Sequence, residues 1–568
     1  IVTGLIILVV IIMGITALIN KYTPTKKTED LKEYFNISSD DEAALIVDNE
    51  LSDYKAKIID KKIYVDYKFV HDSLNSRFYW DANENVLLYT TASDIISAAA
   101  DSNSYSVTKQ TNDFGYPIVK ATSDSALIAL DYVKQYSNIT FKSYDDPARI
   151  VITSKWDEID SATVSKSTQV RVKGGIKSPI LKEVKKDDKI TILDSGDKWD
   201  KIATEDGVIG YIKGKALSES KKTKLTNPDY EEETFTHIKK DKDICLAWNQ
   251  VTSQSANSKV PQVISSTKGI NVMSPTWFYL NDNNGNLADI ASKDYVSYCH
   301  SQGIEVWGLF SNFENTDVDA AYVLTHTSTR TTLINQIMSA AFNYELDGVN
   351  IDFENITEAA YGDSYIEFIR ELAIKCHNNG ISLSVDVTVP ASFNKFFNRS
   401  DMANFADYIV IMGYDEHYKG SDAGSVSSIP WVTEGVESTL KEVPADQIIL
   451  GMPFYTRIWE LTPKEDDDAV TDTEDQSKYT VASQVYSMDA AAAQLATNNA
   501  TAALDEESGQ NYAEWSVSNK LYKVWLEDST SLEKRLKLVD DNKLAGAAFW
   551  KLGFENSSVW DTVIKYLN

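Results

Sequence analysis

The chain has 568 residues, 43% of them hydrophobic and 24% charged, which is the composition of a globular protein with roughly two to four domains. Its formal net charge of −29 argues against a nucleic-acid partner, because phosphate binding requires clustered Lys and Arg. Its three cysteines have no CxxC spacing and its six histidines form no i,i+4 pair, so we expect inert, buried thiols and neither a metal nor a cofactor.

The N-terminal segment has the composition of a transmembrane helix. Ile1 to Ile19 carry no charge and would span roughly 28 Å as a helix, close to the thickness of the hydrocarbon layer. The run has no A-x-A-like exit, which favours a single-pass membrane anchor over residues 1–20; secretion after signal cleavage is the alternative. Nearby lysines alone would favour the opposite orientation, so an extracellular location for the rest is inferred from its domains.

Residues 21–42 are polar and are predicted to form a linker, and residues 43–155 contain an internal repeat. Ile63–Thr91 aligns with Ala126–Thr153, and each copy is predicted to form a strand, a short helix and a β-hairpin. The repeat resembles the small α+β module at the N-termini of copper amine oxidases. No copper chemistry follows, because the segment has no histidine cluster.

Residues 160–218 have short apolar runs separated by turns about every eight to twelve residues, which predicts a small all-β barrel. The segment resembles a bacterial Src-homology-3-type domain. The resemblance implies binding of cell-wall peptides, and a plain spacer is the alternative.

Residues 234–568 alternate short apolar runs with amphipathic helices, which predicts an α/β fold, the (β/α)8 TIM barrel. An insertion is expected after the seventh strand, from about Trp459 to Asp528, with the acidic run Lys464–Gln476 as a solvated loop within it. The eight predicted strands are Ile244–Trp248, Gly269–Trp277, Glu305–Phe310, Gly348–Phe353, Ser382–Val387, Tyr408–Gly413, Ile448–Pro453 and Gly546–Trp550.

The fourth of these strands, in LDGVNIDFENI, alternates apolar and polar residues with period two. Strands of a parallel barrel are buried on both faces, so the apolar set should face the helices and the polar set the interior. Burying polar groups is costly unless they bond each other or a ligand. The polar set is Asn350, Asp352 and Glu354, and Glu354 lies at the carboxyl end of the strand, where barrel enzymes hold their active sites.

The stretch DGVNIDFE (Asp347 to Glu354) resembles the DGxDxDxE signature of family-18 glycoside hydrolases. MGYDEH and AAFWKLG resemble that family's strand-six and strand-eight segments. Two departures are Asn350 in place of the middle Asp, and VWGLFSN in place of the SxGG motif of chitinases. SPTWF, LGMPFYTRIW and VWLEDSTSLEKRLKLV look more like bacterial spore-cortex and cell-wall N-acetylglucosaminidases.

The resemblance implies a retaining, substrate-assisted mechanism in which the substrate supplies the nucleophile. It makes Glu354 the general acid, while Asp352 would hold the acetamido N–H and Tyr414 the attacking oxygen. Asn350 would orient Asp352 and keep it ionised. Supporting positions are Asp347, Asn350, Met412 and Asp415, and the expected sugar-binding aromatics are Trp550, Trp277, Phe278, Tyr455 and Trp459.

The implied substrate is a polysaccharide containing N-acetylglucosamine in the bacterial cell wall, cleaved by a monomer tethered to the membrane. A chitinase or endo-N-acetylglucosaminidase on the same barrel is one alternative. A catalytically silent sugar-binding module is another, although its usual mark, loss of the acidic Glu, is absent here. A third is a wall-sensing receptor in which the N-terminal domains do the main work.

Overall fold

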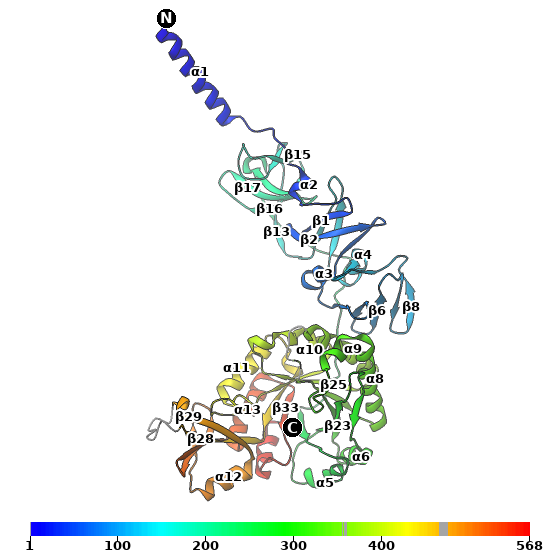
Figure 1. Cartoon of the computed structure of the whole chain (residues 1–568), viewed down its shortest axis with the longest axis vertical. Coiled ribbons are helices and arrows are strands. Elements are labelled where there is room, and N and C mark those ends of the chain that lie inside the picture. The colour runs from blue at the N-terminus through cyan, green and yellow to red at the C-terminus, as the bar shows by residue number, and fades with distance from the viewer. Residues whose placement is uncertain (1, 355, 357–360, 465–474, 568) are drawn as a thin grey trace. The chain divides into compact units, whose positions relative to one another are not determined.

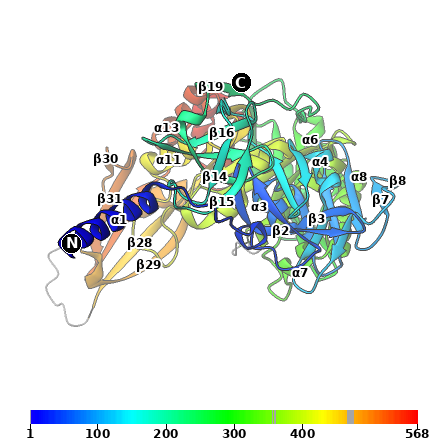
Figure 2. The ribbon, with the colours of Figure 1, turned by 90° about the horizontal axis from the view of Figure 1, so that it is seen from above.

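The computed structural model describes residues 2–354, 356, 361–464 and 475–567. By contacts the chain divides into two compact units, residues 1–89 with 96–233, and residues 90–95 with 234–568. Figure 1 and Figure 2 label the elements of both units.

The first helix of the chain, α1 (Val2–Tyr22), is long and apolar enough to cross a membrane. Its segment Thr3–Tyr22 has a mean hydropathy of 2.5. A signal sequence near the N-terminus has the same properties, so retention of this helix as an anchor stays a prediction. The predicted linker is not wholly irregular, because Asp30 accepts a hydrogen bond from the Lys32 N–H and caps the short helix α2 (Leu31–Tyr34).

The internal repeat folds in the predicted element order in both copies. The first runs β3, α3 (Tyr67–Ser73), β4, β5, and the second β10, α4 (Leu130–Tyr136), β11, β12. One sheet has the order β11-β12-β1-β2-β3-β10-β9, and β4 to β8 form another in sequence order. The strands are β1 (Glu42–Val47), β2 (Glu50–Ile59), β3 (Lys62–Asp66), β4 (Phe78–Asp81), β5 (Val86–Thr90), β6 (Ile95–Ala99), β7 (Ser104–Val107), β8 (Gln110–Asp113), β9 (Val119–Ala121), β10 (Ala126–Ala129), β11 (Thr140–Tyr144) and β12 (Arg149–Thr153).

A further seven-stranded sheet has the order β15-β14-β18-β17-β16-β13-β19. It extends beyond the predicted limits of residues 160–218, because β19 pairs with β13 and adds a strand to the sheet. The resemblances of these N-terminal segments to known modules remain predictions. The strands are β13 (Glu158–Thr163), β14 (Thr168–Arg171), β15 (Ile180–Val184), β16 (Lys189–Asp194), β17 (Trp199–Thr204), β18 (Ile209–Lys213) and β19 (Lys221–Lys224).

The second unit contains the predicted barrel. Its nine-stranded sheet has the order β20-β33-β27-β26-β25-β24-β23-β21-β22, and β20 also pairs with β21, so eight parallel strands close on themselves. The ninth strand, β22 (Leu287–Asp289), pairs antiparallel with Phe278 to Leu280 of β21. These residues lie beyond Trp277, where the predicted strand ended. The eight strands are β20 (Ile244–Asn249), β21 (Val272–Leu280), β23 (Glu305–Ser311), β24 (Gly348–Asp352), β25 (Ser382–Thr388), β26 (Tyr408–Met412), β27 (Ile448–Pro453) and β33 (Gly546–Trp550).

Helices cover the outside of the barrel (Figure 1). They are α5 (Val260–Val263), α6 (Lys293–Ser301), α7 (Ala320–Thr325), α8 (Thr327–Tyr344), α9 (Gly362–His377), α10 (Arg399–Phe405), α11 (Ile429–Thr439), α13 (Ser529–Asn542) and α14 (Trp560–Tyr566).

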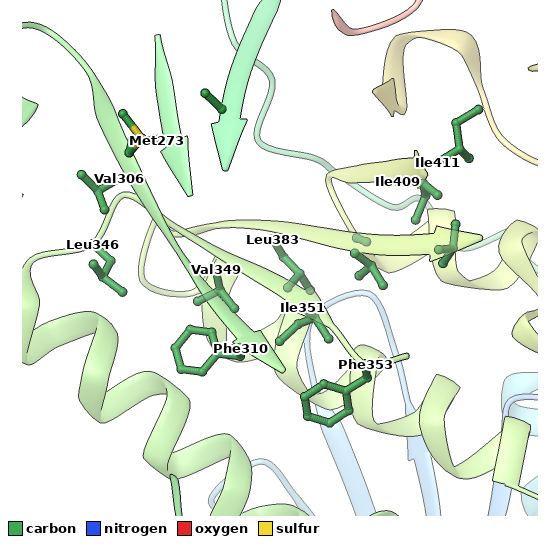
Figure 3. Packing of buried hydrophobic residues seen from close by; sticks show 14 of the residues in the cluster. Met273, Val306, Phe310, Leu346, Val349, Ile351, Phe353, Leu383, Ile409 and Ile411 are labelled. Carbon is green, nitrogen blue, oxygen red and sulfur yellow. The ribbon is translucent and has the colours of Figure 1, made fainter. Parts of the chain in front are cut away.

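The alternation in β24 is explained by two separate apolar layers. Val349, Ile351 and Phe353 belong to the large cluster between the strands and the helices, as Figure 3 shows. A smaller cluster that includes Trp248 and Trp307 fills the barrel interior. The predicted orientation of both faces of this strand is therefore confirmed.

Gly348 begins β24 because a side chain would not fit there. A Cβ added to it would lie 2.5 Å from Trp307 Cδ1, closer than real Cβ contacts. The glycine in the DG pair thus allows the interior tryptophan to lie against the strand.

The insertion after β27 begins earlier than predicted, because β28 (Tyr455–Pro463) follows β27 almost directly. Its five-stranded sheet has the order β29-β28-β32-β31-β30, with α12 (Met488–Thr497) beside it. The acidic run falls largely outside the described residues, at 465–474. The remaining strands are β29 (Tyr479–Ser487), β30 (Ala503–Asp505), β31 (Gln510–Val517) and β32 (Lys520–Leu526).

Buried charges join the insertion to the barrel. Arg535 on α13 donates to both carboxylate oxygens of Glu527 at 2.7 Å, and its Nη2 donates to the Ser427 carbonyl at 2.6 Å. Both charged side chains are almost fully buried.

The three cysteines are buried free thiols, as the sequence predicts.

Candidate active site

A pocket of about 920 Å³ opens where the barrel strands end at their carboxyl termini. Aromatic side chains and carboxylates dominate its walls. The carboxylates are Glu314, Asp352, Glu354, Asp386, Asp415 and Glu416, and none of the described residues lining the pocket is Lys or Arg. The site is therefore strongly acidic and has concave, partly apolar walls, as a site for a polar small molecule or saccharide requires.

Asn350 is the centre of a buried hydrogen-bond network beneath the pocket. Its Oδ1 accepts from the Trp248 indole N–H at 3.0 Å and from the Ser274 hydroxyl at 2.9 Å. Its Nδ2 donates to the Ser384 hydroxyl at 3.0 Å and to Asp386 Oδ1 at 2.7 Å. The expectation that Asn350 orients Asp352 is therefore wrong, because both amide protons are directed toward the neighbouring strand β25.

Asp352 is 6% exposed, and its Oδ1 is buried without a hydrogen-bond partner among the described residues. Burial raises the pKa of Asp352 well above its ordinary value, and the nearby carboxyls of Asp386, Glu354 and Glu314 raise it further. A raised pKa favours the protonated form of Asp352, contrary to the expectation that Asn350 keeps it ionised.

Glu354 lies two residues beyond the end of β24, and its side chain remains accessible from the pocket. Burial raises the pKa of Glu354, and the charges of Asp415 and Glu314 raise it further. These like charges come from the loops after β26 and β23. A carboxyl with a raised pKa keeps its proton to higher pH than an ordinary Glu, which suits a proton donor.

Other predicted residues meet Glu354 at the pocket. Met412, Tyr414, Asp415 and Trp550 all line it. Burial, followed by the charges of Asp352 and Asp386, raises the pKa of Tyr414, so its hydroxyl remains a hydrogen-bond donor. Asp415 has a φ of 59°, in the left-handed region, which Asp adopts more readily than most other non-glycine residues.

Three predicted sugar-binding aromatics do not line the pocket. The Trp277 indole N–H donates to Asn257 Oδ1 at 2.8 Å, and its ring packs against Tyr295 beneath the helices. Phe278 stacks on Phe310 with ring centroids 4.5 Å apart, in the same outer layer. Trp459 is buried in the core of the insertion.

Two more predicted positions, Tyr455 and Asp347, also lie outside the pocket lining. Tyr455 is 4% exposed and its hydroxyl donates to Asp415 Oδ1 at 2.6 Å, so it holds that carboxylate and does not form a wall. Asp347 lies at the opposite end of β24, where it accepts the Val306 N–H at 2.8 Å and contacts His300 Nε2 at 2.7 Å.

Asp386 is the residue that the sequence analysis missed. It is 4% exposed and lies on β25, where Ser382, Ser384 and Asp386 alternate with apolar residues. This is the same period-two signal that identified β24. The pocket also has unpredicted aromatic walls, including Trp248, Phe313, Phe393, Tyr418 and Trp431.

Comparison with known proteins agrees with the architecture of the barrel. Residues 314–555 match the model of the family described as glycosyl hydrolases family 18. The chain is 24% identical over 302 residues to an uncharacterized glycosylase of Bacillus subtilis, covering 50% of this chain and 81% of that protein. It is 24% identical over 287 residues to the cortical fragment-lytic enzyme of the same organism, covering 49% of this chain and 63% of that one.

The chain thus spans less than two thirds of the cortical fragment-lytic enzyme. Among solved structures, the spore cortex-lytic enzyme of Bacillus cereus superposes with a TM-score of 0.51 at 19% identity, covering 58% of this chain and 76% of that one. At this identity the likeness shows a shared fold alone. From the match over residues 314–555, the closed eight-stranded barrel and the acidic pocket at its mouth, we conclude that the barrel of the second unit is similar to glycosyl hydrolases family 18.

Proposed function

We propose that this chain is a retaining β-N-acetylglucosaminidase that acts on bacterial cell-wall glycan by substrate-assisted catalysis. The observation that carries the proposal is the joint presence of Asp352, Glu354, Tyr414 and Trp550 in one pocket at the barrel mouth. A purified full chain should cleave peptidoglycan or a GlcNAc oligosaccharide, and mass analysis of the products identifies the bond. Binding of these glycans with no product from any of them would support a catalytically silent sugar-binding module instead.

In the proposed reaction, protonated Glu354 donates its proton to the glycosidic oxygen as the bond to the anomeric carbon breaks. The carbonyl oxygen of the sugar's own acetamido group attacks that carbon and forms an oxazolinium ion. Tyr414 donates a hydrogen bond to this oxygen, and Asp352 accepts the acetamido N–H. Glu354, now a carboxylate, removes a proton from water, which opens the oxazolinium ring with net retention.

Trp550 forms the stacking surface for the sugar in this proposal. Its ring lies edge-on to Trp248, 6.0 Å between centroids, which fixes its orientation. Trp550→Ala is expected to lower kcat/KM by about 10- to 100-fold, mostly through KM, because burial of a large side chain against a sugar contributes about 1.5–3 kcal/mol. Trp550→Phe should recover part of the loss, and equal loss in both variants would contradict stacking.

The pH dependence of the reaction should follow the protonation of Glu354. The acid is active when protonated, so activity falls as pH rises through its raised pKa. Asp415→Asn removes one like charge and still accepts the Tyr455 hydrogen bond, so the alkaline limb should move to lower pH by on the order of one unit. Rate profiles of the variant and of a surface control, Asp541→Asn, measure this, and an unmoved limb in Asp415→Asn would contradict the coupling.

The acidity of the pocket favours a second candidate substrate. Six carboxylates line it and no described lining residue is basic, so a glycan with free carboxylates near the cleaved bond would be repelled. A neutral chitin-type oligosaccharide avoids this cost. Comparing kcat/KM for chitin oligosaccharides and for wall glycan, with and without its peptide stems, separates the two candidates.

Membrane tethering through α1 completes the proposal. It is supported by the length and hydropathy of that helix. The full chain expressed in a bacterial host should sediment with membranes, and externally added protease should release the barrel from intact cells or protoplasts. A soluble product lacking the first residues would instead support signal cleavage.

A further inference from the structure

We propose that Asp386 is the proton acceptor of Asp352, so that these two carboxyls hold one proton between them and exchange it when the substrate arrives. Asp386 is then a positioning residue, because it acts through Asp352. The inference rests on the proposed hydrolysis and adds to it a residue on another strand.

The strand register places the two carboxyls side by side. Asn350 pairs with Ser384 and Ile351 with Val385, so Asp352 and Asp386 occupy the next positions of β24 and β25. Adjacent strands lie about 4.8 Å apart. Both side chains are almost fully buried and both line the pocket.

Their hydrogen bonds differ in a way that decides which of the two carboxyls holds the proton before substrate binds. Asp386 Oδ1 accepts from Asn350 Nδ2 at 2.7 Å, which stabilises a carboxylate at Asp386. Asp352 Oδ1 is buried and has no such donor among the described residues. The proton therefore resides on Asp352, and the negative charge on Asp386.

Substrate binding reverses this distribution. An acetamido N–H that donates to Asp352 favours its ionised form, so the proton moves from Asp352 to the Asp386 oxygen that does not bond Asn350. Asp352 becomes a carboxylate that offsets the positive oxazolinium, and Asp386 becomes neutral. The proton returns when the acetamido group leaves, and no other reactant is needed.

Several charged or titratable groups face this pair from the surrounding elements. Glu354 comes from the end of β24, Glu314 from the loop after β23, and Tyr414 from the loop after β26. Burial raises the pKa of Tyr365 on α9, and the charges of both aspartates raise it further. Burial raises the pKa of Asp386, the Asn350 hydrogen bond opposes this, and Glu354 adds to it.

The network also explains how Asn350 can occupy its position. An amide at residue 350 cannot take a proton from Asp352, but it directs a neighbouring carboxylate that can. A carboxyl on β25 and an amide on β24 would therefore do together what a carboxyl at residue 350 could do alone.

The decisive test is an exchange of the two groups. Asp386→Asn is expected to lower kcat about 100-fold with KM changed less than about threefold, and the double variant N350D/D386N should recover at least tenfold of that loss. The pH–rate profile of Asp386→Asn should also differ from that of wild type, because only one ionisable carboxyl of the pair remains. Asp386→Ala, which removes both the charge and the hydrogen bond to Asn350, should lower kcat at least as much as Asp386→Asn.

A second measurement does not depend on turnover. The infrared band of protonated carboxyl groups is measured in the unliganded full chain, and the part that belongs to Asp352 is identified by its loss in Asp352→Asn. This band should titrate at lower pH in Asp386→Asn than in wild type. Removing the neighbouring charge makes ionisation of Asp352 easier.

The outcomes separate this inference from the proposed function. If Glu354→Gln abolishes cleavage while Asp386→Asn keeps wild-type kcat, rate profile and infrared titration, the carboxyl pair is refuted and the hydrolysis stands. If Glu354→Gln retains wild-type cleavage, the proposed function fails first. A folded N350D/D386N variant no more active than Asp386→Asn also refutes the exchange.

Discussion

Glu354→Gln is expected to lower kcat for glycan cleavage by about 100- to 10,000-fold, the range that general acid catalysis contributes. The amide keeps the size of the side chain but cannot give a proton to the glycosidic oxygen. Glu354 is accessible from the pocket, and burial followed by the charges of Asp415 and Glu314 raises its pKa, so wild type keeps this proton to higher pH than an ordinary Glu would. Steady-state rates on one oligosaccharide measure the change.

The matched control is Glu434→Gln on the exposed face of α11, which should retain wild-type activity. Thermal melting of both variants should match wild type, because within the described part of the chain Glu354 forms no ion pair whose loss would weaken the barrel. Binding of an uncleaved oligosaccharide should survive in Glu354→Gln. Cleavage at the wild-type rate by this folded variant would contradict the assignment of Glu354 as the proton donor.

Arg535→Met is expected to destabilise the second unit by about 3–5 kcal/mol, the cost of breaking a buried ion pair by removing one partner. The substitution leaves the Glu527 carboxylate buried without its counter-charge and frees the Ser427 carbonyl. Burial already raises the pKa of Glu527, and Arg535 opposes that shift. Chemical denaturation followed by tryptophan fluorescence in the full chain should show the loss.

The double variant Arg535→Met with Glu527→Gln tests the cause. Neutralising Glu527 removes the unpaired charge, so much of the lost stability should return even though the ion pair stays absent. A double variant that is less stable than Arg535→Met would show that hydrogen bonding to the neighbouring groups, and not the unpaired charge, sets the cost.

The period-two pattern of β24 was readable from sequence because its alternation is complete over six residues. The same rule, applied to β21, would have excluded Trp277. Ser274 bonds the interior residue Asn350 and Thr276 lines the pocket, so Trp277 between Thr276 and Phe278 must face the helices. A shift in pairing register between Thr276 and Phe278 then turns Phe278 outward as well. Period-two alternation does not reveal such an irregularity.

Contacts between strands were harder to predict than the strands themselves. The link from Asn350 to Asp386 joins residues 36 positions apart, and it depends on the register of β24 against β25. Sequence alone assigned Asn350 to its nearest acidic neighbour along the chain. Proximity to a strand end was likewise a poor guide to the aromatics, because Trp459 lies in the insertion sheet and its indole N–H donates to Gly424.

The crowded carboxyls of the pocket also have a calorimetric consequence. A neutral saccharide that displaces water from the walls weakens solvation of the charged forms and should raise the pKa values of Glu354 and Asp386 further. Complex formation would then absorb protons from solution, so the observed heat should vary with the ionisation enthalpy of the buffer. By the same linkage, the dissociation constant should decrease as the medium becomes more acidic over the range in which those groups titrate.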